Sequence, residues 1–482
     1  MAFGLVVPLA LVSNPRIGRR SGQPAVVYVA TRARTSRISP QAAGLSYETS
    51  SLLPGADGVR YFRADNASLV RLFRTLGIAS LRIGGNSVDQ GSALPTDQDI
   101  VSLFDFARAA NVKVIYSVRL KDGDPQAAAH AAGLIHQRFA DRIECYSIGN
   151  EPSYYKDYDI YRARWTTIRD AMVAADPQAR FCAPDENPSP ELSARMIREF
   201  GNEAGRLVQL SQHSYPFGCS YRNPKEKDLA RLVPFDAAES REKMLQPSAY
   251  QVYQKIHDQT ARLVQGTSLS FRLTETNSYW FSGLQGASDS YASALWAADY
   301  LYWWISHGAV GLNFHTGDRT GGAITLPARY AVFVTSPHGY QVRPLAYGLK
   351  LFDLGGHGTL VPAEVRASPH QNLAAYATLG EDNSLAITLI NKTHGPAAAP
   401  TEVQIRLDAP LADAQVRAIE LRSANNDIAA DASTVTLGGA AIQEDGTWNG
   451  AWSEMPKSAI SRDAITVTML PASGMVIRAR VR

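Results

Sequence analysis

Two glutamates that end apolar stretches are the residues whose types and spacing best suit acid–base chemistry in this sequence. Glu151 ends "YSIGNE" and is followed at once by Pro152, which stops a strand, while Glu275 ends "SFRLTE". A glutamate is costly to bury without a partner. Two carboxyl groups that face each other can hydrolyse a glycosidic bond, because one donates a proton to the leaving oxygen while the other attacks the anomeric carbon. At a separation of about 5–5.5 Å, the reaction retains configuration through a covalent intermediate.

Several other polar residues stand at or near the ends of apolar stretches of the same kind. They are Glu48, Asn150, His213, Tyr215 and His315. A single polar residue in such a place is usually an ordinary loop residue, so its position alone assigns it no role. Other hydrolytic chemistries lack their motifs, since the sequence contains no HExxH and no GxSxG, and no GK[ST] follows its glycine-rich stretches. We therefore expect neither a metal nor a cofactor.

Strands must position the two glutamates, and short apolar stretches alternate with helical patterns between residues 41 and 350. The predicted strands are 44–48, 80–85, 112–118, 146–151, 180–185, 208–215, 270–275 and 311–315. Helix start signals follow several of them: Thr96 is a cap residue, and Asp124–Pro125 and Ser189–Pro190 each place a cap before a proline. Eight such units predict an α/β fold, a (β/α)8 TIM barrel over residues 41–351.

The barrel gives the two glutamates a common location. The active face of a TIM barrel lies at the C-terminal ends of its strands. Glu151 ends the fourth predicted strand and Glu275 the seventh. Because these strands stand nearly across the barrel, we expect the two carboxyl groups to face each other over its mouth.

The rest of the chain alternates apolar and polar residues without a helical pattern. Two strands surround a "GEDN" turn within 373–390, and further strand patterns continue to the C-terminus. The N-terminal stretch "AVVYVATRARTSRI" is also strand-like. We therefore predict a second, smaller domain, an all-β sandwich built from residues 1–40 plus 352–482.

The composition excludes several kinds of partner. The 482 residues carry a formal net charge of +3 with scattered basic residues, so we expect no nucleic-acid partner. No run reaches the ~20 apolar residues of a membrane span. Cys145, Cys182 and Cys219 form neither a disulfide framework nor a CxxC pair, and the first two are expected to be small core residues. The apolar N-terminal stretch lacks the charged start of a signal peptide and is predicted to be a strand.

The motifs at these positions together resemble a known enzyme family. "GNEP" and "TETN" carry the two glutamates, and "LSYETSSL", "LRIGGNS", "HSY" and "PLAYGLKLF" extend the likeness over most of the chain. They resemble glycoside hydrolase family 79, which contains β-glucuronidases and heparanase. The resemblance implies a retaining β-glucuronidase for a glucuronic-acid-containing glycan or glycoside. Because the sequence shows no basic cleft of the kind that binds heparin, we expect it to act on terminal residues, as an exo-β-glucuronidase. Such an enzyme is expected to be exported to the periplasm or the extracellular space.

The resemblance also implies roles for individual residues. Glu151 becomes the general acid/base and Glu275 the nucleophile, held by Tyr215. Contacts with the sugar are implied for Glu48, Asn150 (to the 2-hydroxyl), His213 and His315. The tyrosines expected to meet the uronate carboxylate are Tyr279, Tyr330 and Tyr340. Trp280 stands where the family carries its aromatic residue after the nucleophile.

Several alternatives remain open. The same barrel serves neutral-sugar β-glycosidases and endo-acting, heparanase-like hydrolases, and an inactive carbohydrate-binding protein is a rival of a different class. The charged insertion 222–243 is either a wall of the pocket or a solvated loop, and the two arginines of 316–329 either reach the substrate or belong to a surface loop. The sequence leaves the oligomeric state undetermined.

Overall fold

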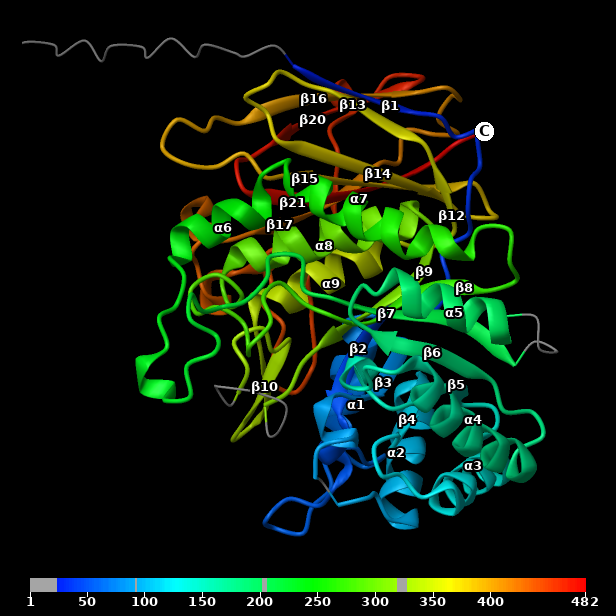
Figure 1. Ribbon diagram of the computed structural model, residues 1–482. Coiled ribbons are helices and arrows are strands. Elements are labelled where there is room, and N and C mark those ends of the chain that lie inside the picture. The colour runs from blue at the N-terminus through cyan, green and yellow to red at the C-terminus, as the bar shows by residue number, and fades with distance from the viewer. Residues whose placement is uncertain (1–23, 92, 202–205, 319–326) are drawn as a thin grey trace, which may run out of the picture.

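Eight parallel strands form a closed barrel in the computed structural model, which describes residues 24–91, 93–201, 206–318 and 327–482 (Figure 1). In order around the barrel the strands are β2 (Ala43–Glu48), β3 (Ser80–Gly84), β4 (Lys113–Val118), β5 (Ile143–Ile148), β6 (Phe181–Glu186), β7 (Leu207–Ser214), β8 (Ser270–Thr276) and β9 (Ala309–His315). The pairing of β9 with β2 closes the ring. The predicted TIM barrel is therefore confirmed, and each predicted strand lies within three residues of an observed one.

Helices surround the barrel. They are α1 (Ala67–Thr75), α2 (Asp97–Ala110), α3 (Pro125–Phe139), α4 (Tyr158–Ala175), α5 (Pro190–Phe200), α6 (Ala237–Leu245), α7 (Ala249–Gln259), α8 (Tyr291–Ser306) and α9 (Pro344–Gly355). The predicted start signals hold: Thr96 forms a capping box with Asp99, and the Asp124 side chain caps α3 ahead of Pro125. Ser189 precedes Pro190 as expected, but its side chain makes no capping hydrogen bond.

Two sheets, in which most neighbouring strands are antiparallel, form the all-β part of the molecule. One contains β13 (Ala363–Arg366), β1 (Ala25–Val29), β16 (Thr401–Leu407) and β20 (Ala464–Met469). The other contains β12 (Thr359–Val361), β14 (Leu373–Leu379), β15 (Ser384–Asn391), β21 (Ser473–Arg480), β17 (Arg417–Arg422) and β18 (Thr436–Leu437), with β19 (Ser453–Glu454) beside β17. Apolar residues of both sheets share one core, which makes the pair a sandwich.

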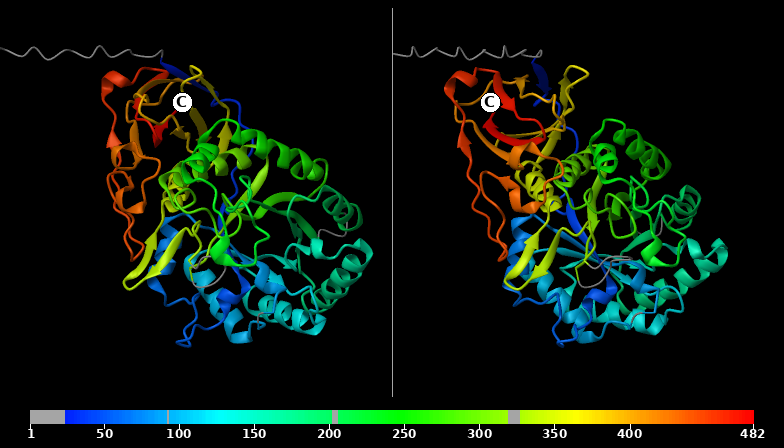
Figure 2. Two further views of the ribbon diagram at one scale, coloured as in Figure 1. Left: turned by 60° about the vertical axis from the view of Figure 1, so that its left-hand side comes forward. Right: turned by 90° about the vertical axis from the view of Figure 1, so that its left-hand side faces the viewer.

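The N-terminal strand belongs to the sandwich. β1 pairs antiparallel with β13 and parallel with β16, more than 300 residues away in sequence. Figure 1 shows it in blue at the top of the molecule, among yellow and orange strands, and the turned views of Figure 2 show the sandwich as a lobe beside the barrel. The chain therefore starts in the sandwich before it builds the barrel.

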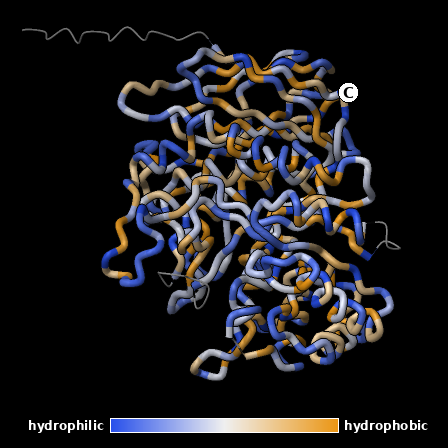
Figure 3. Tube along the Cα trace, viewed as in Figure 1, coloured by the Kyte–Doolittle hydropathy of each residue, from blue (hydrophilic) through white to orange (hydrophobic). Residues whose placement is uncertain are grey.

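Helices α8 and α9 lie between the two lobes. The side chains of α8 are buried from Tyr291 to Ile305, and α9 packs against α8 and against strands of the sandwich. Apolar residues dominate the inner strands and helices of both lobes, whereas hydrophilic residues dominate the outer loops (Figure 3). A short hairpin, β10 (Phe333–Ser336) and β11 (Gly339–Val342), extends from the barrel beside α1. No described helix is long and apolar enough to cross a membrane.

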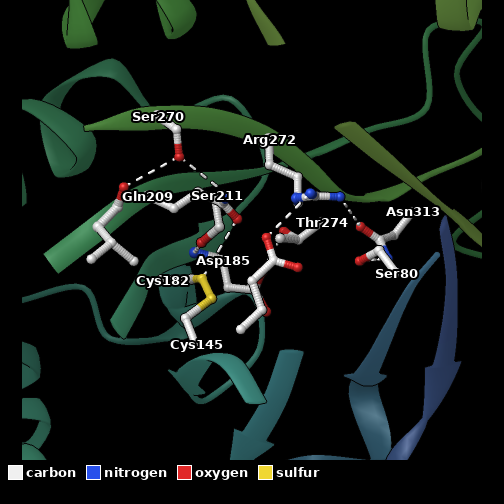
Figure 4. The surroundings of a disulfide bond; sticks show 12 residues. Ser80, Cys145, Cys182, Asp185, Gln209, Ser211, Ser270, Arg272, Thr274 and Asn313 are labelled. Atoms are coloured by element: carbon white, nitrogen blue, oxygen red, sulfur yellow. Dashed lines mark hydrogen bonds and ion pairs between the residues drawn. A yellow bond between two sulfur atoms is a disulfide. The ribbon is translucent and has the colours of Figure 1, made fainter. Parts of the chain in front are cut away.

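One expectation about the cysteines is wrong. Cys145 on β5 and Cys182 on β6 form a disulfide inside the barrel wall, with their Cα atoms 5.8 Å apart (Figure 4). Both are buried, as predicted, but they face each other because neighbouring parallel strands bring their side chains together. A spacing of 37 residues gave no sign of this pairing. The strand predicted at the N-terminus, residues 2–13, lies outside the described residues, as does Arg319 of the 316–329 loop.

Candidate active site

The C-terminal ends of the barrel strands surround a cavity of about 810 Å³. Its described lining consists of Glu48, Ser50, Asn86, Ser87, Gln90, Glu151, Asn187, Tyr215, Glu275, Trp280, Phe281, Ser282, His315 and Tyr330. Both predicted catalytic glutamates are in this set. The cavity is large enough for a sugar ring and part of what is attached to it, within the usual range for ligand pockets.

Glu275 lies near the end of β8 and is held by several donors. Its Oε1 accepts a hydrogen bond of 2.8 Å from the Tyr215 hydroxyl, and its Oε2 lies 2.6 Å from Arg82 Nη1. His315 Nδ1 lies 3.6 Å from the same Oε2. Burial alone would raise the pKa of Glu275, but the charges of His315, His213 and Arg82 outweigh it and lower the pKa to about 2. The carboxylate is thus held ionised and oriented, as a nucleophile must be.

Glu151 follows β5 through an unusual turn. The strand ends at Ile148, Gly149 adopts φ = 85°, and Glu151 itself lies in the left-handed region with φ = 46°. Its backbone N–H donates to the carbonyl of Asp185. The preceding Asn150 N–H donates to the Asp89 carboxylate at 3.1 Å. These contacts hold a strained backbone that turns the Glu151 side chain toward the cavity.

The two carboxyl groups meet over the barrel mouth. One carboxylate oxygen of Glu151, one of Glu275 and one ring nitrogen of His213 all lie within 4.8 Å of one another. Residues far apart in sequence are thus brought together by strands on opposite sides of the barrel, as predicted. The spacing is close to the about 5–5.5 Å of retaining carboxyl pairs and shorter than the 6.5–9.5 Å of inverting ones.

A buried chain of charges connects the two glutamates. His213 Nδ1 lies 3.0 Å from Glu151, and its Nε2 lies 3.2 Å from Asp185. Arg82 then bridges Asp185, at 2.5 Å, and Glu275. The side chains of Arg82, Asp185 and His213 are fully buried.

The charges in this chain balance. Burial alone would lower the pKa of His213, but Glu275 and Asp185 outweigh it and raise the pKa to about 10, so the imidazole carries a proton. Burial likewise opposes the ionisation of Asp185, yet Arg82 and His213 hold its pKa well below the usual range. Two cations, Arg82 and His213, therefore offset two anions, Asp185 and Glu275.

Three further predicted residues line the cavity. Glu48 accepts hydrogen bonds from the backbone N–H groups of Asn86 and Ser87, and its Oε1 lies 3.8 Å from His315 Nε2. Tyr330 packs its ring 6.2 Å from that of Tyr215 and 5.9 Å from that of His315. These groups can bind sugar hydroxyls on the side of the cavity that lies next to Glu275.

Four predicted substrate-binding residues are not among those that line the cavity. Asn150 is buried, accepts from Arg82 at 2.7 Å and donates to the Asn86 side chain, so it braces the site from behind. His213 is buried beneath Glu151. We correct the expectation for the other two: Tyr279 donates to the carbonyl of Ser240 and packs on Phe217, and Tyr340 pairs with Asn66 and packs on Phe333. Both rings fill apolar space away from the glutamates.

The charged insertion 222–243 is also absent from the described lining. Part of it forms α6, whose Arg241 donates to the carbonyl of Gly286, and its first residues pair with one another through Arg222 and Val233. The described loop residue Arg329 lies 4.0 Å from Asp289 and is likewise not a lining residue. The interpretation of these segments as surface structure therefore fits the described contacts better than a role as pocket walls.

Sequence reasoning missed Arg82, Asp185 and Phe281, and it gave Trp280 a place in the family motif but no role in the site. A signal existed for Arg82, because an arginine within the apolar stretch "SLRIGG" must find buried anions. Asp185 ends "RFCAPD" at the same level of the barrel, and the two are natural partners once the barrel is assumed. For the residue that faces the cavity after Glu275, the resemblance pointed to the position of Trp280, but the hydroxyl of Tyr279 favoured that tyrosine instead, and the structure places Trp280 in the lining.

The same atoms also resemble a metal-binding set. Glu151, His213 and Glu275 each offer one ligand atom within 4.8 Å of the others. A ligating histidine must be neutral, however, and His213 is held protonated between Asp185 and Glu151. Arg82 already supplies a cation to Glu275. The donor set therefore fits a protonated network better than a metal ion.

Comparisons with known proteins agree with the fold. No family model and no curated protein matches the chain. Among solved structures, an arabinofuranosidase of glycoside hydrolase family 51 from Xanthomonas axonopodis pv. citri has a TM-score of 0.66 at 15% identity, covering 95% of this chain and 100% of its own. A 4-O-α-L-rhamnosyl-β-D-glucuronidase from Fusarium oxysporum has 0.66 at 16%, covering 93% and 99%. An α-L-arabinofuranosidase from Thermotoga maritima has 0.66 at 16%, covering 95% and 100%. The chain therefore shares the fold of these glycosidases over nearly its whole length.

Proposed function

We propose that this protein is a retaining glycoside hydrolase, with Glu275 as nucleophile and Glu151 as general acid/base. The observation that carries the proposal is the approach of the two carboxyl groups to within 4.8 Å at the mouth of the barrel. Glu275, ionised and held by Tyr215 and Arg82, attacks the anomeric carbon while Glu151 protonates the departing oxygen. Water then enters with Glu151 as base, and the glycosyl–Glu275 ester is hydrolysed.

The His213 imidazolium stabilises the carboxylate that Glu151 becomes when it donates its proton. After Glu151 has given up its proton, its carboxylate faces the Nδ1–H of His213 at 3.0 Å. Asp185 accepts from the other ring nitrogen and keeps the imidazole in place. The newly formed charge is thus stabilised by a donor that is already oriented, which is the usual source of electrostatic catalysis.

Substitution of each glutamate tests the mechanism. Glu275→Gln should lower kcat by at least about 10³-fold, because the amide cannot form the ester. Glu151→Ala should lose activity mostly on substrates with poor leaving groups, and added azide should restore turnover and yield a glycosyl azide of retained configuration. Glu191→Gln, on an exposed glutamate of α5, is the matched control and should leave activity unchanged. Normal turnover by Glu275→Gln would remove the mechanism.

For the sugar, we propose β-linked glucuronic acid, released from the non-reducing end. The motif resemblance supports this choice, and so do Tyr330 and His315, which offer donors beside Glu275 to a carboxylate at C5. Glucuronic-acid-containing glycans lie outside most cells. The Cys145–Cys182 disulfide supports an exported protein, because disulfides persist mainly in oxidising compartments.

A neutral sugar is the second candidate, favoured by one observation. The described lining contains three glutamates and neither lysine nor arginine. The negative charge of a uronate carboxylate would therefore find little electrostatic attraction in the cavity. The kcat/KM values for aryl β-glucuronide, β-xyloside and β-glucoside, measured side by side, decide between the two. A preference of more than tenfold for a neutral glycoside would replace the glucuronidase proposal and leave the retaining mechanism intact.

A further inference from the structure

The loop after the nucleophile presents two stacked aromatic rings to the cavity. Trp280 and Phe281 both line it, with ring centroids 5.3 Å apart and planes 23° from parallel. Trp280 is 40% exposed, which is unusual for a tryptophan in this otherwise well-packed barrel. Because the facing sides of the two rings cover each other, the apolar surface that the cavity meets lies mainly on the more exposed ring, Trp280, with Phe281 supporting it.

The backbone beneath these rings is strained. Phe281 and Ser282 adopt φ angles of 72° and 67°, a region that a bulky side chain such as phenylalanine rarely enters. Gly283 follows with φ = 79°, and a Cβ atom there would meet the backbone N of Tyr330 at 2.7 Å. Three consecutive left-handed residues, two of them not glycine, persist only where the surroundings impose them.

Neighbouring segments impose this conformation through several hydrogen bonds. The Trp280 N–H donates to the carbonyl of Gly218 at 2.9 Å, and its own carbonyl accepts from the N–H and the hydroxyl of Ser220. The N–H of Arg329 donates to the Ser282 carbonyl at 2.6 Å. The ring of Tyr221 packs edge-on against Phe281 at 5.9 Å. The rings are therefore held in place before any ligand arrives.

The depth of the site indicates which part of a substrate these rings meet. Glu275, His315 and Tyr330 are buried at the bottom of the cavity, whereas Trp280 is exposed at its rim. In a pocket that is closed at the bottom, the sugar that forms the covalent intermediate occupies the depth. The group that leaves must point toward the exit. An apolar surface at the rim therefore faces the leaving group rather than the bound sugar.

We propose that Trp280 and Phe281 form an aglycone-binding platform that stacks against a flat leaving group, either an aromatic ring or the C–H face of a second pyranose. This inference rests on the proposed glycosidase function and adds the chemical class of the aglycone to it. Stacking on a preformed aromatic surface contributes on the order of a tenfold gain in affinity. A small alkyl aglycone covers little of the exposed Trp280 ring and therefore gains little from it.

The test compares 4-nitrophenyl and methyl β-glycosides of the same sugar in the wild type, Trp280→Ala and Trp280→Phe. Trp280→Ala should lower kcat/KM for the nitrophenyl glycoside about tenfold and change that for the methyl glycoside less than twofold. Trp280→Phe, which keeps a flat ring, should recover most of the loss. Equal losses on both substrates, or no loss on either, would overturn the platform.

A binding measurement separates this proposal from the proposed function. Calorimetric titration with the 4-nitrophenyl and methyl glucuronides and xylosides requires no turnover. If the wild type hydrolyses no glycoside but binds a nitrophenyl glycoside more tightly than its methyl counterpart, and Trp280→Ala abolishes that difference, the platform stands and the hydrolase proposal fails. If wild-type affinity is the same for both aglycones, the platform fails whatever the activity.

Discussion

At the scale of single residues, the ionisation of Glu275 depends on charged neighbours that come from three other strands. Arg82 lies on β3, His213 on β7 and His315 on β9, and together they hold the pKa of the β8 carboxyl at about 2 despite its burial. A carboxyl group with this pKa stays ionised throughout the range from pH 4 to 9. If kcat/KM falls toward acidic pH within that range, the titration of a group other than Glu275 must cause the fall.

The lowered pKa of Glu275 predicts a pH dependence of stability. The pKa of Glu275 in the folded protein lies below its ordinary value of 4.5, so the ionised side chain stabilises the folded state. This stabilisation is fully present above pH 4.5 and is lost as the pH falls toward 2. The difference in unfolding free energy between the wild type and Glu275→Gln should therefore change by roughly 3 kcal/mol between pH 5 and pH 2. Urea unfolding at several pH values measures it. For Glu191→Gln, whose side chain is 80% exposed, the difference should stay flat.

The candidate site could be predicted only in part, for reasons that differ from residue to residue. The approach of Glu151 and Glu275 could be predicted because the C-terminal ends of barrel strands converge. That rule depends on the backbone alone and not on how side chains pack. Tyr279 and Trp280 are neighbours, and which of them faces the cavity depends on the left-handed turn at Phe281 and Ser282. No propensity predicts such a turn, since it is imposed by Ser220, Gly218 and Arg329, which are distant in sequence.

At the scale of elements, β5 ends in a way that aims Glu151. Gly149 has φ = 85°, and a Cβ atom there would lie 2.7 Å from Leu120 Cβ. Only a glycine at position 149 lets the chain leave the strand and turn so that the Asn150 N–H reaches the Asp89 carboxylate. The predicted strand boundaries were close, but this strand was expected to end at Glu151 and ends at Ile148, so the turn that orients Glu151 was not foreseen.

Gly149→Ala should therefore reduce stability and activity together. Left-handed strain and the contact with Leu120 should cost about 2 kcal/mol or more in unfolding free energy, and a displaced Glu151 should lower kcat at least tenfold. Gly133→Ala in α3 is the control, because its added Cβ meets only Ala175 at 3.6 Å. That variant should gain about 0.5–1 kcal/mol from helix propensity and keep full activity. Chemical denaturation and initial rates measure both; an active, stable Gly149→Ala enzyme would contradict the role of this turn.

At the scale of the whole molecule, loops of the sandwich hold it against helices of the barrel. The loops on either side of β18 contact the barrel. The N–H groups of Tyr291 and Ala292 on α8 donate to the carbonyls of Ala430 and Ile428, and Arg71 of α1 pairs with Asp445. The sandwich could be predicted as an all-β unit from alternation, which is a local pattern. The position of β1 between β13 and β16 could not, because pairing partners hundreds of residues apart leave no trace in a single sequence.

A buried ion pair links the two lobes. Lys392, directly after β15, lies 2.6 Å from Asp299 of α8, and both side chains are at most 5% exposed. The hydroxyls of Tyr250 and Tyr376 donate to the two carboxylate oxygens of Asp299. Donors from α7, from β14 and from the residue after β15 thus converge on the carboxylate of Asp299.

Removing one partner of this pair should cost far more than removing both. Asp299→Ala leaves the Lys392 ammonium buried without its anion, so the free energy of unfolding should fall by about 3–5 kcal/mol. In Asp299→Ala/Lys392→Met no charge is stranded, and a large part of that loss should return. Glu381→Ala, which breaks the exposed pair between Arg37 and Glu381, should change stability by less than about 1 kcal/mol. Denaturant unfolding of the four proteins measures these differences. If the double variant were less stable than Asp299→Ala, the pair would not join the lobes as a unit, and the attachment of the sandwich would rest on apolar packing of α8 and α9 alone.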